Sequence, residues 1–274
     1  GANGVSQLFT TTVQAGGVFS VSVPAALVGG GFTVVASGTD AAGNTATASD
    51  NGVIDITVPT VTVDAPALTN DTTPPLTGTT NLPVGATVTL TVTGANGAVQ
   101  TFTAIVQTGG VFSVDVPAAL VQGNFSVTAT ATDAAGNSAS ATDTGENDTT
   151  PPAATMTIDP VTADNIVNAG EASGNITLTG TVGGDVRVGD TVTLNVNGVN
   201  YTGLVLAGNT FAISVPGAAV LADADRRIDG SVTTTDAAGN SATATAQRAY
   251  AVNSAPIAVN DTLSIGEDTV SAGS

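Results

Sequence analysis

The stretch FSVTATATDAAGNSASATDT, Phe125–Thr144, alternates small polar and apolar residues on both sides of a short acidic segment. Alternation with a period of two is typical of half-buried β-strands, because successive side chains face opposite sides of a sheet. The central hexapeptide TDAAGN contains Gly and Asn, which tolerate the positive φ of a tight turn. The stretch therefore predicts a hairpin of two antiparallel strands.

The hexapeptide occurs three times, at residues 39–44, 132–137 and 235–240. The first two copies are 93 residues apart, and the third follows after 103 residues. A second motif, GGVFSV, recurs with the same 93-residue spacing at 16–21 and 109–114. Two motifs in one register indicate a tandem repeat of about 100 residues.

Each repeat shows about seven short alternating segments, separated by Gly, Asn and Asp at intervals of roughly 8–12 residues. Helical spacing is not sustained anywhere. This pattern predicts an all-β protein of tandem immunoglobulin-like antiparallel β-sandwiches in an elongated array. The chain has no Trp and no Cys, which excludes the antibody-type core but not the architecture. Phe112 and Phe125 are the expected core residues.

Alignment of the copies divides the chain into four parts. Residues 1–57 form a first, partial repeat, because this copy lacks the stretch that 60–93 supplies in the second. Residues 58–150 form the second repeat and 151–253 the third, which diverges to SVPGAAVLADADRR after Ile213 and carries an insertion. Residues 254–274 belong to another module. The chain is thus expected to be a section of a longer protein.

Charge excludes several classes of partner. The net charge of the chain is −18, from 22 acidic residues against four arginines and no lysine. Nucleic acids and anionic lipids need basic patches, so we expect neither as a partner. No apolar run approaches the ~20 residues of a membrane span, and residues 1–20 do not read as a signal peptide. The expected form is a monomer that does not insert into a membrane.

The absence of Cys and His from the sequence removes further chemistry. Thiolate nucleophiles, Ser-His-Asp triads, disulfides and thiolate or imidazole zinc sites all require one of these residues. Only oxygen ligands remain, and these suit calcium or magnesium.

The repeat ends are the expected calcium sites. An immunoglobulin-like topology places the turn between the last two strands at the entry end of a domain, beside the preceding linker. The linkers SDNGVID (49–55) and TDTGENDTTPP (142–152) are acidic, and converging carboxylates repel one another unless a cation neutralises them. Ca²⁺ takes about six to eight oxygens. The candidate ligands are Asp50, Asp55 and Asp133 at the first joint, Asp143, Glu146, Asp148 and Asp236 at the second, and Asp40 in the first turn.

A second acidic group, Asp159, Asp164 and Glu171, lies between the first strands of the third repeat. It predicts another calcium site at the exit end, although loop polarity explains it equally well. Two simpler interpretations also stay open for the joints. The hexapeptide can be a hairpin turn alone, and the acidic linkers can be solvated segments without a metal.

Several motifs resemble a known family. TDAAGN, NDTTPP (147–152) and DPVTADNIVNAGEA (159–172) look like the tandem bacterial immunoglobulin-like repeats of giant biofilm-associated and RTX-type adhesins. SAPIAVNDTLSIGEDT (254–269) resembles the start of a VCBS or cadherin-like repeat. The resemblance implies an extracellular protein of the bacterial cell surface, exported by type I secretion. It also implies that repeats act as an extender stiffened by calcium, supporting adhesion and biofilm formation.

Three classes of function follow. The leading hypothesis is a structural extender whose partners are the neighbouring repeats, with a host-cell or biofilm-matrix receptor bound by domains outside this chain. The alternative is a carbohydrate- or protein-binding sandwich, for which Tyr201 and Tyr250 are the only plausible aromatic platforms. An enzyme is not expected, because the acids follow the repeat joints and do not gather within one repeat.

Overall fold

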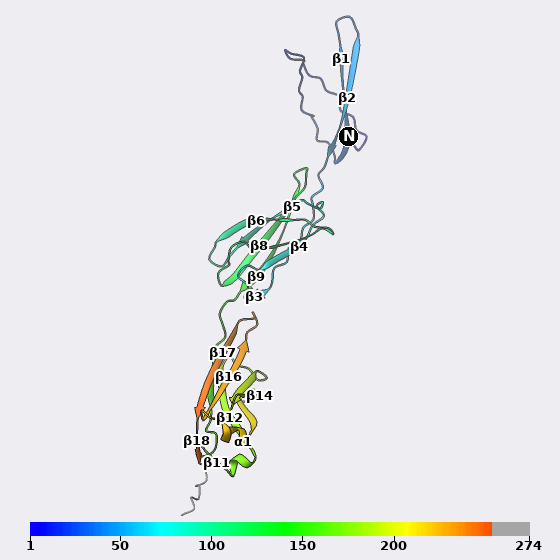
Figure 1. Cartoon of the computed structure of the whole chain (residues 1–274). Coiled ribbons are helices and arrows are strands. Elements are labelled where there is room, and N and C mark those ends of the chain that lie inside the picture. The colour runs from blue at the N-terminus through cyan, green and yellow to red at the C-terminus, as the bar shows by residue number, and fades with distance from the viewer. Residues whose placement is uncertain (254–274) are drawn as a thin grey trace, which may run out of the picture. The chain divides into compact units, whose positions relative to one another are not determined.

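The computed structural model describes residues 1–253 (Figure 1). The chain divides into two compact units at Thr149 and Thr150. The second repeat has a core formed between Ala65 and Ala131, and the third repeat has a separate core within 156–250. Among the described residues, no helix has the length and apolarity to cross a membrane. The VCBS-like segment expected at 254–274 lies outside the described residues.

The first repeat consists of one hairpin. Strands β1 (Gly30–Thr39) and β2 (Thr45–Ile54) pair antiparallel, with Thr39 opposite Thr45 on either side of the turn. No residue of 1–57 is fully buried, so this repeat has no core of its own.

The second repeat is an antiparallel sandwich closed by a short parallel pair. A five-stranded sheet has the order β3-β9-β8-β5-β6, and the pair β4-β7 forms a further sheet. Their bounds are β3 (Leu68–Thr69), β4 (Pro75–Thr79), β5 (Thr87–Thr93), β6 (Val99–Ile105), β7 (Val111–Asp115), β8 (Gly123–Thr132) and β9 (Ser138–Asn147). The alternation predicted from the sequence appears directly in β8, where Phe125, Val127, Ala129 and Ala131 are buried.

The third repeat has a related arrangement with an added helical segment. Its sheets have the orders β10-β12-β15, β14-β13-β16-β17 and β11-β18. The bounds are β10 (Ala154–Ile158), β11 (Ile166–Asn168), η1 (Glu171–Ser173), β12 (Asn175–Gly184), β13 (Thr191–Val196), β14 (Val199–Leu204), β15 (Thr210–Pro216), α1 (Gly217–Ala222), β16 (Arg227–Thr235), β17 (Ser241–Ala249) and β18 (Ala251–Asn253). These strands confirm the all-β immunoglobulin-like class.

A phenylalanine faces a glycine directly across the ladder at four places in the chain. The pairs are Phe32–Gly52, Phe112–Gly78, Phe125–Gly145 and Phe211–Gly180. A Cβ added to any of these glycines would come within 3.0 Å of the ring. The rings of Phe112, Phe125 and Phe211 are almost completely buried. The glycine therefore makes the space in which the ring lies, and the expected core role of Phe112 and Phe125 is confirmed.

The acidic segments differ from the sequence interpretation. The linkers were expected at 49–55 and, overlapping a strand that ends at Thr144, at 142–152, but β2 continues to Ile54 and β9 continues to Asn147. In the second half of β9 the inward positions are Asp143, Gly145 and Asn147, which are polar or lack a side chain. Without apolar residues at these positions, this half of the strand does not show the alternation that identifies a strand.

We predict that Gly180→Ala destabilises the third repeat by about 2 kcal/mol or more, because the new methyl group must displace the Phe211 ring or the Thr157 carbonyl. The measurement is urea unfolding followed by tyrosine fluorescence, since both tyrosines lie in this repeat and the chain has no Trp. Gly174→Ala is the control, because a Cβ there meets nothing within 4 Å. Equal midpoints for the two variants would contradict the role of the pair.

Candidate functional site

The repeated hexapeptide is a turn closed by its own aspartate. In the third copy, Oδ1 of Asp236 accepts from the backbone N–H groups of Ala238 and Asn240, both at 2.9 Å, and Oδ2 accepts from Nδ2 of Asn240 at 3.0 Å. The hydroxyl groups of Thr235 and Ser241 meet across the strands at 2.8 Å, and Gly239 has a φ of 96°. The same carboxylate bonds occur at Asp40 and Asp133.

These bonds favour the ionised aspartate. The pKa of the Asp236 carboxyl lies below its ordinary value, and the hydrogen bond from the side-chain amide of Asn240 is the largest cause. Burial acts in the opposite direction, and hydrogen bonds from backbone N–H groups lower the pKa further. Asn44 lowers the pKa of Asp40 and Asn137 lowers that of Asp133 in the same way. Each carboxylate thus has a structural role that requires no metal.

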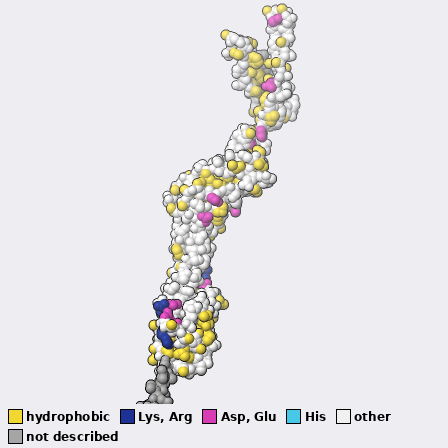
Figure 2. Space-filling view, viewed as in Figure 1, with side chains coloured by type: hydrophobic (Ala, Val, Ile, Leu, Met, Phe, Trp, Pro, Cys, Tyr) yellow, Lys and Arg dark blue, Asp and Glu magenta, His cyan; other side chains and the backbone are white. Residues whose placement is uncertain are grey.

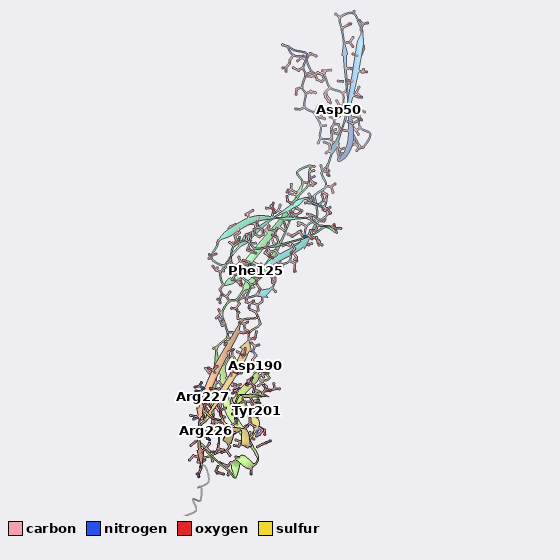
Figure 3. All side chains as sticks on the ribbon, viewed as in Figure 1. Asp50, Phe125, Asp190, Tyr201, Arg226 and Arg227 are labelled. Atoms are coloured by element: carbon pink, nitrogen blue, oxygen red, sulfur yellow. The ribbon has the colours of Figure 1, made fainter. Side chains whose placement is uncertain are left out.

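The second turn lies beside the segment that enters its repeat. Nδ2 of Asn137 donates to the backbone carbonyl of Asp55 at 3.1 Å, so the turn and Asp55 are brought together. Asp50 is not brought to this turn, because it lies within β2 (Figure 3), where it pairs with Val34. Asp55 is five positions further along the chain, which corresponds to about 16 Å of extended backbone.

The acids at the end of the second repeat separate onto two faces. Asp143 points inward, and its Oδ2 accepts from the backbone N–H of Ala65 at 2.8 Å, which lowers the pKa of Asp143. Glu146 lies on the outward face of the same strand. The backbone N–H of Asp148 donates to the carbonyl of Thr69 at 2.9 Å. Asp143 therefore ties the start of the repeat to its last strand, facing away from Glu146.

The acids at 159, 164 and 171 of the third repeat accept hydrogen bonds from within that repeat. Asp159 accepts from the hydroxyl of Thr179 at 2.7 Å, Asp164 accepts from the N–H of Ile166 at 3.0 Å, and Glu171 accepts from the N–H of Asn168 at 3.0 Å. The contacts of Asp164 and Glu171 hold local bends of the chain, whereas that of Asp159 joins two segments 20 residues apart.

Carboxylate and carbonyl oxygens are the donors that Ca²⁺ prefers, so the repeat ends fit a calcium ion in chemical kind. The number of acidic side chains that come together among the described residues is too small for such a site. Within the part of the chain that the structure describes, no group of three or more acidic side chains is gathered closely enough to hold a metal. The expected site that combines Asp236 with acids of the preceding repeat draws on both units and stays a prediction.

The anchoring roles of two residues were not identified from the sequence. Asn147 and Tyr250 each follow the aspartate of the hexapeptide by 14 residues. Asn147 is fully buried, and its Nδ2 donates to the carbonyl of Leu120 at 3.0 Å. The hydroxyl of Tyr250 donates to the carbonyl of Val220 at 2.7 Å. Their shared distance from the hexapeptide is the signal that marks them as one structural position.

The ends of both complete repeats are closed by parallel pairing. β3 pairs with β9 through Leu68–Glu146 and Thr69–Asn147, and β11 pairs with β18 over three residues from Ile166–Ala251. In each repeat an early segment of the chain thus runs alongside the last strand in the same direction.

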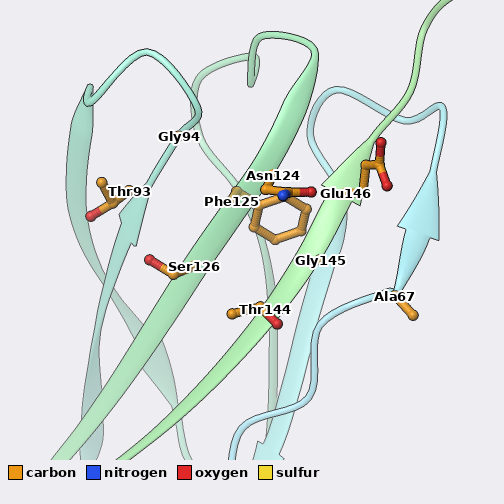
Figure 4. A pocket seen from close by; sticks show the side chains of 9 residues that line it. All are labelled: Ala67, Thr93, Gly94, Asn124, Phe125, Ser126, Thr144, Gly145 and Glu146. Atoms are coloured by element: carbon orange, nitrogen blue, oxygen red, sulfur yellow. The ribbon is translucent and has the colours of Figure 1, made fainter.

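An open hollow of ≈ 600 Å³ lies on the second repeat (Figure 4). Its lining includes Thr93, Ser126, Thr144 and Glu146, and also Phe125, which is only 2% exposed. The two tyrosines expected as aromatic platforms both lie in the third repeat. Tyr201 is half-buried in β14 and packs against the core, and Tyr250 is 6% exposed.

We predict that Asp236→Ala lowers the stability of the third repeat at neutral pH, because the turn loses three hydrogen-bond acceptances. A lowered folded pKa contributes stability above the unfolded value of 3.8 and loses it as the pH falls. The difference in tyrosine-monitored unfolding midpoint between the two chains should therefore shrink on acidification. A difference that stays constant with pH would show that the ionised carboxylate does not support the turn.

Comparisons with known proteins agree with this architecture. A model of the bacterial Ig-like domain family matches residues 60–159. No curated protein matches the chain. A Ca²⁺-stabilised adhesin that helps an Antarctic bacterium reach out and bind ice is 34% identical, with a TM-score of 0.58 over 82% of this chain. The chain spans 57% of the length of that structure.

A second structure, from a 1.5-MDa bacterial ice-binding adhesin described for its retention at the host cell surface, is 31% identical with a TM-score of 0.54. The alignment covers 81% of this chain and 74% of that one. These matches are to immunoglobulin-like domains of adhesins and indicate no catalytic family. The chain therefore belongs to the bacterial immunoglobulin-like repeats of large adhesins.

Proposed function

We propose that the chain is an extender segment of a large bacterial surface adhesin, in which folded repeats carry tension between the cell and a distant adhesive domain. The observation that carries the proposal is the parallel pairing of an early segment with the last strand in both complete repeats. Similarity to large adhesins supports it.

Parallel pairing determines how a pulling force acts on a repeat. In two parallel strands the amino-terminal end of one and the carboxyl-terminal end of the other lie at opposite ends of the ladder. Tension applied to the two chain ends therefore pulls along the strands and loads their hydrogen bonds together. A hairpin pulled at its two open ends would lose its bonds one after another.

Side chains and backbone extend the short β3–β9 pair. Asp143 holds the N–H of Ala65, and the N–H of Glu146 donates to the carbonyl of Ala67 at 3.1 Å. The N–H of Asp148 adds a bond to Thr69 beyond the paired residues. The pair of two residues is thus the centre of a longer clamp.

We further propose that calcium stiffens the joints. At the first joint Asp55 and Asp133 would contribute, because the turn of Asp133 contacts the Asp55 backbone through Asn137. At the second joint Asp236 would act with Glu146 and Asp148. Calcium would neutralise carboxylates in a chain of net charge −18. Biofilm formation, type I secretion and a receptor bound by other domains belong to the same proposal.

Asp143→Ala should make the second repeat unfold at lower force, because the clamp loses a hydrogen bond to a charged group. The expected cost is about 1 kcal/mol, or a roughly fivefold faster unfolding under load. The measurement is optical-tweezers extension of the full chain. Thr142→Ala is the control, since Thr142 is exposed on the same strand. Unchanged rupture forces for Asp143→Ala would contradict the clamp.

Removal of calcium with a chelator should shorten and loosen the chain in X-ray scattering, while circular dichroism keeps its β signature because each complete repeat has its own core.

In calorimetry with Ca²⁺ on the full chain, the variants Asp133→Ala and Asp236→Ala should each show a lower calcium affinity or one site fewer. An unchanged scattering profile and unchanged calcium binding in both variants would contradict the proposal that the hexapeptide binds calcium.

A further inference from the structure

A buried carboxyl group lies at the exit of the third repeat and takes no part in the joints described above. Asp223 follows α1 directly and is only 5% exposed. Its Oδ2 lies 3.2 Å from the hydroxyl oxygen of Tyr250, which is itself buried between β17 and β18. The same hydroxyl donates to the carbonyl of Val220 at 2.7 Å.

The number of hydrogens at this contact differs between the ionised and the protonated form of Asp223. A tyrosine hydroxyl has one hydrogen to donate and can also accept. With Asp223 ionised, the Val220 carbonyl and the carboxylate are both acceptors, and one hydrogen must serve two oxygens. With Asp223 protonated, its O–H donates to Tyr250, and Tyr250 donates to Val220. The backbone N–H of Arg227 also donates to the Asp223 carboxyl, and the Asp225 side chain shares a hydrogen bond with it. At the Tyr250 contact itself, the protonated form gives both the carboxyl oxygen and the hydroxyl a full hydrogen bond.

The surrounding charges favour the same form. Burial is the largest cause that raises the pKa of Asp223, and the neighbouring carboxylate of Asp225 raises it further. Two arginines lie at the start of β16 (Figure 3), but the Arg226 guanidinium donates to the carbonyl of Leu221 and that of Arg227 pairs with Asp225 and Asp229. Figure 2 shows basic and acidic side chains side by side on this unit.

The remaining acidic group on the packed elements is Glu171 of η1, against which α1 lies. Its carboxylate accepts from the N–H of Asn168. Among the described residues, neither arginine forms an ion pair with Asp223.

We propose that Asp223 and Tyr250 form a proton-dependent latch, in which protonated Asp223 and the Val220 carbonyl hold the end of the last strand against the α1 segment. The latch fastens the point where the chain leaves the third repeat, since Tyr250 joins β17 to the clamp strand β18. It goes beyond the extender role and does not depend on it.

The second repeat contains the neutral counterpart of this latch. Asn147 occupies the position of Tyr250 and donates to the carbonyl of Leu120, a contact without a titratable group. The exit of the second repeat should therefore hold equally across the pH range in which that of the third repeat loosens.

The sign of the effect follows from the raised pKa. A carboxyl whose folded pKa is raised contributes its full stability below the unfolded value of 3.8, and loses this contribution as the pH rises through the folded pKa. Asp164 and Asp236 in the same repeat have lowered pKa values and act in the opposite direction. Only a comparison with a variant of Asp223 isolates the latch.

The test is Asp223→Asn in the full chain, because the amide donates to Tyr250 at every pH. Thermal unfolding is followed by tyrosine fluorescence from about pH 4 to about pH 8. The two midpoints should agree near pH 4, and the variant should become more stable by about 4 °C at neutral pH. Asp229→Asn, which neutralises a half-buried acid of β16 that pairs with Arg227 and does not contact Tyr250, should show no such trend.

Hydrogen exchange supplies a second measurement that needs no substitution. In the parent chain, after correction for the intrinsic pH dependence of exchange, residues 217–223 should lose protection as the pH rises, and residues 117–122 should not. Tyr250→Phe should abolish the difference between these two segments. A parent chain and Asp223→Asn with parallel midpoints at all pH values, or equal pH dependence of the two segments, would overturn the latch.

Discussion

The contact of a phenylalanine ring with a cross-strand glycine is the constraint on which each complete repeat depends. The ring fills the volume that the missing side chain leaves, as at Phe112–Gly78 and Phe211–Gly180. A slip of one residue in the ladder would turn the ring to the solvent face and place a Cβ where no space exists. The register of these strands and the packing of the ring in the core follow from this match.

The hairpins were predictable because two independent signals coincide in the sequence. The alternation of FSVTATAT predicts a strand, and TDAAGN predicts the turn that returns it. The continuation of β9 past Thr144 was not predictable, nor were the roles of Asp143 and Asn147, which occupy inward positions that are usually apolar. Their partners, Ala65 and Leu120, are distant in sequence, and only the folded chain identifies them.

The same limit applies to the candidate calcium ligands. Sequence spacing correctly brought the second turn to Asp55, because sandwich topology determines which end of the domain a hairpin occupies. It could not show that the carboxylate of Asp133 already accepts three hydrogen bonds from its own turn, or that Asp143 and Glu146 face opposite sides of a strand. An acid-rich segment fixes the charge near a joint, whereas side-chain direction decides which acids can share an ion.

The location of each phenylalanine–glycine pair within a single repeat bears on how such chains change in length during evolution. Gly78 and Phe112, like Gly180 and Phe211, lie inside one repeat, so recombination between equivalent positions of neighbouring repeats exchanges them in register. Gain or loss of a whole copy leaves every ring opposite its glycine. Repeat number can therefore vary by genetic duplication or deletion without any compensating substitution in the cores.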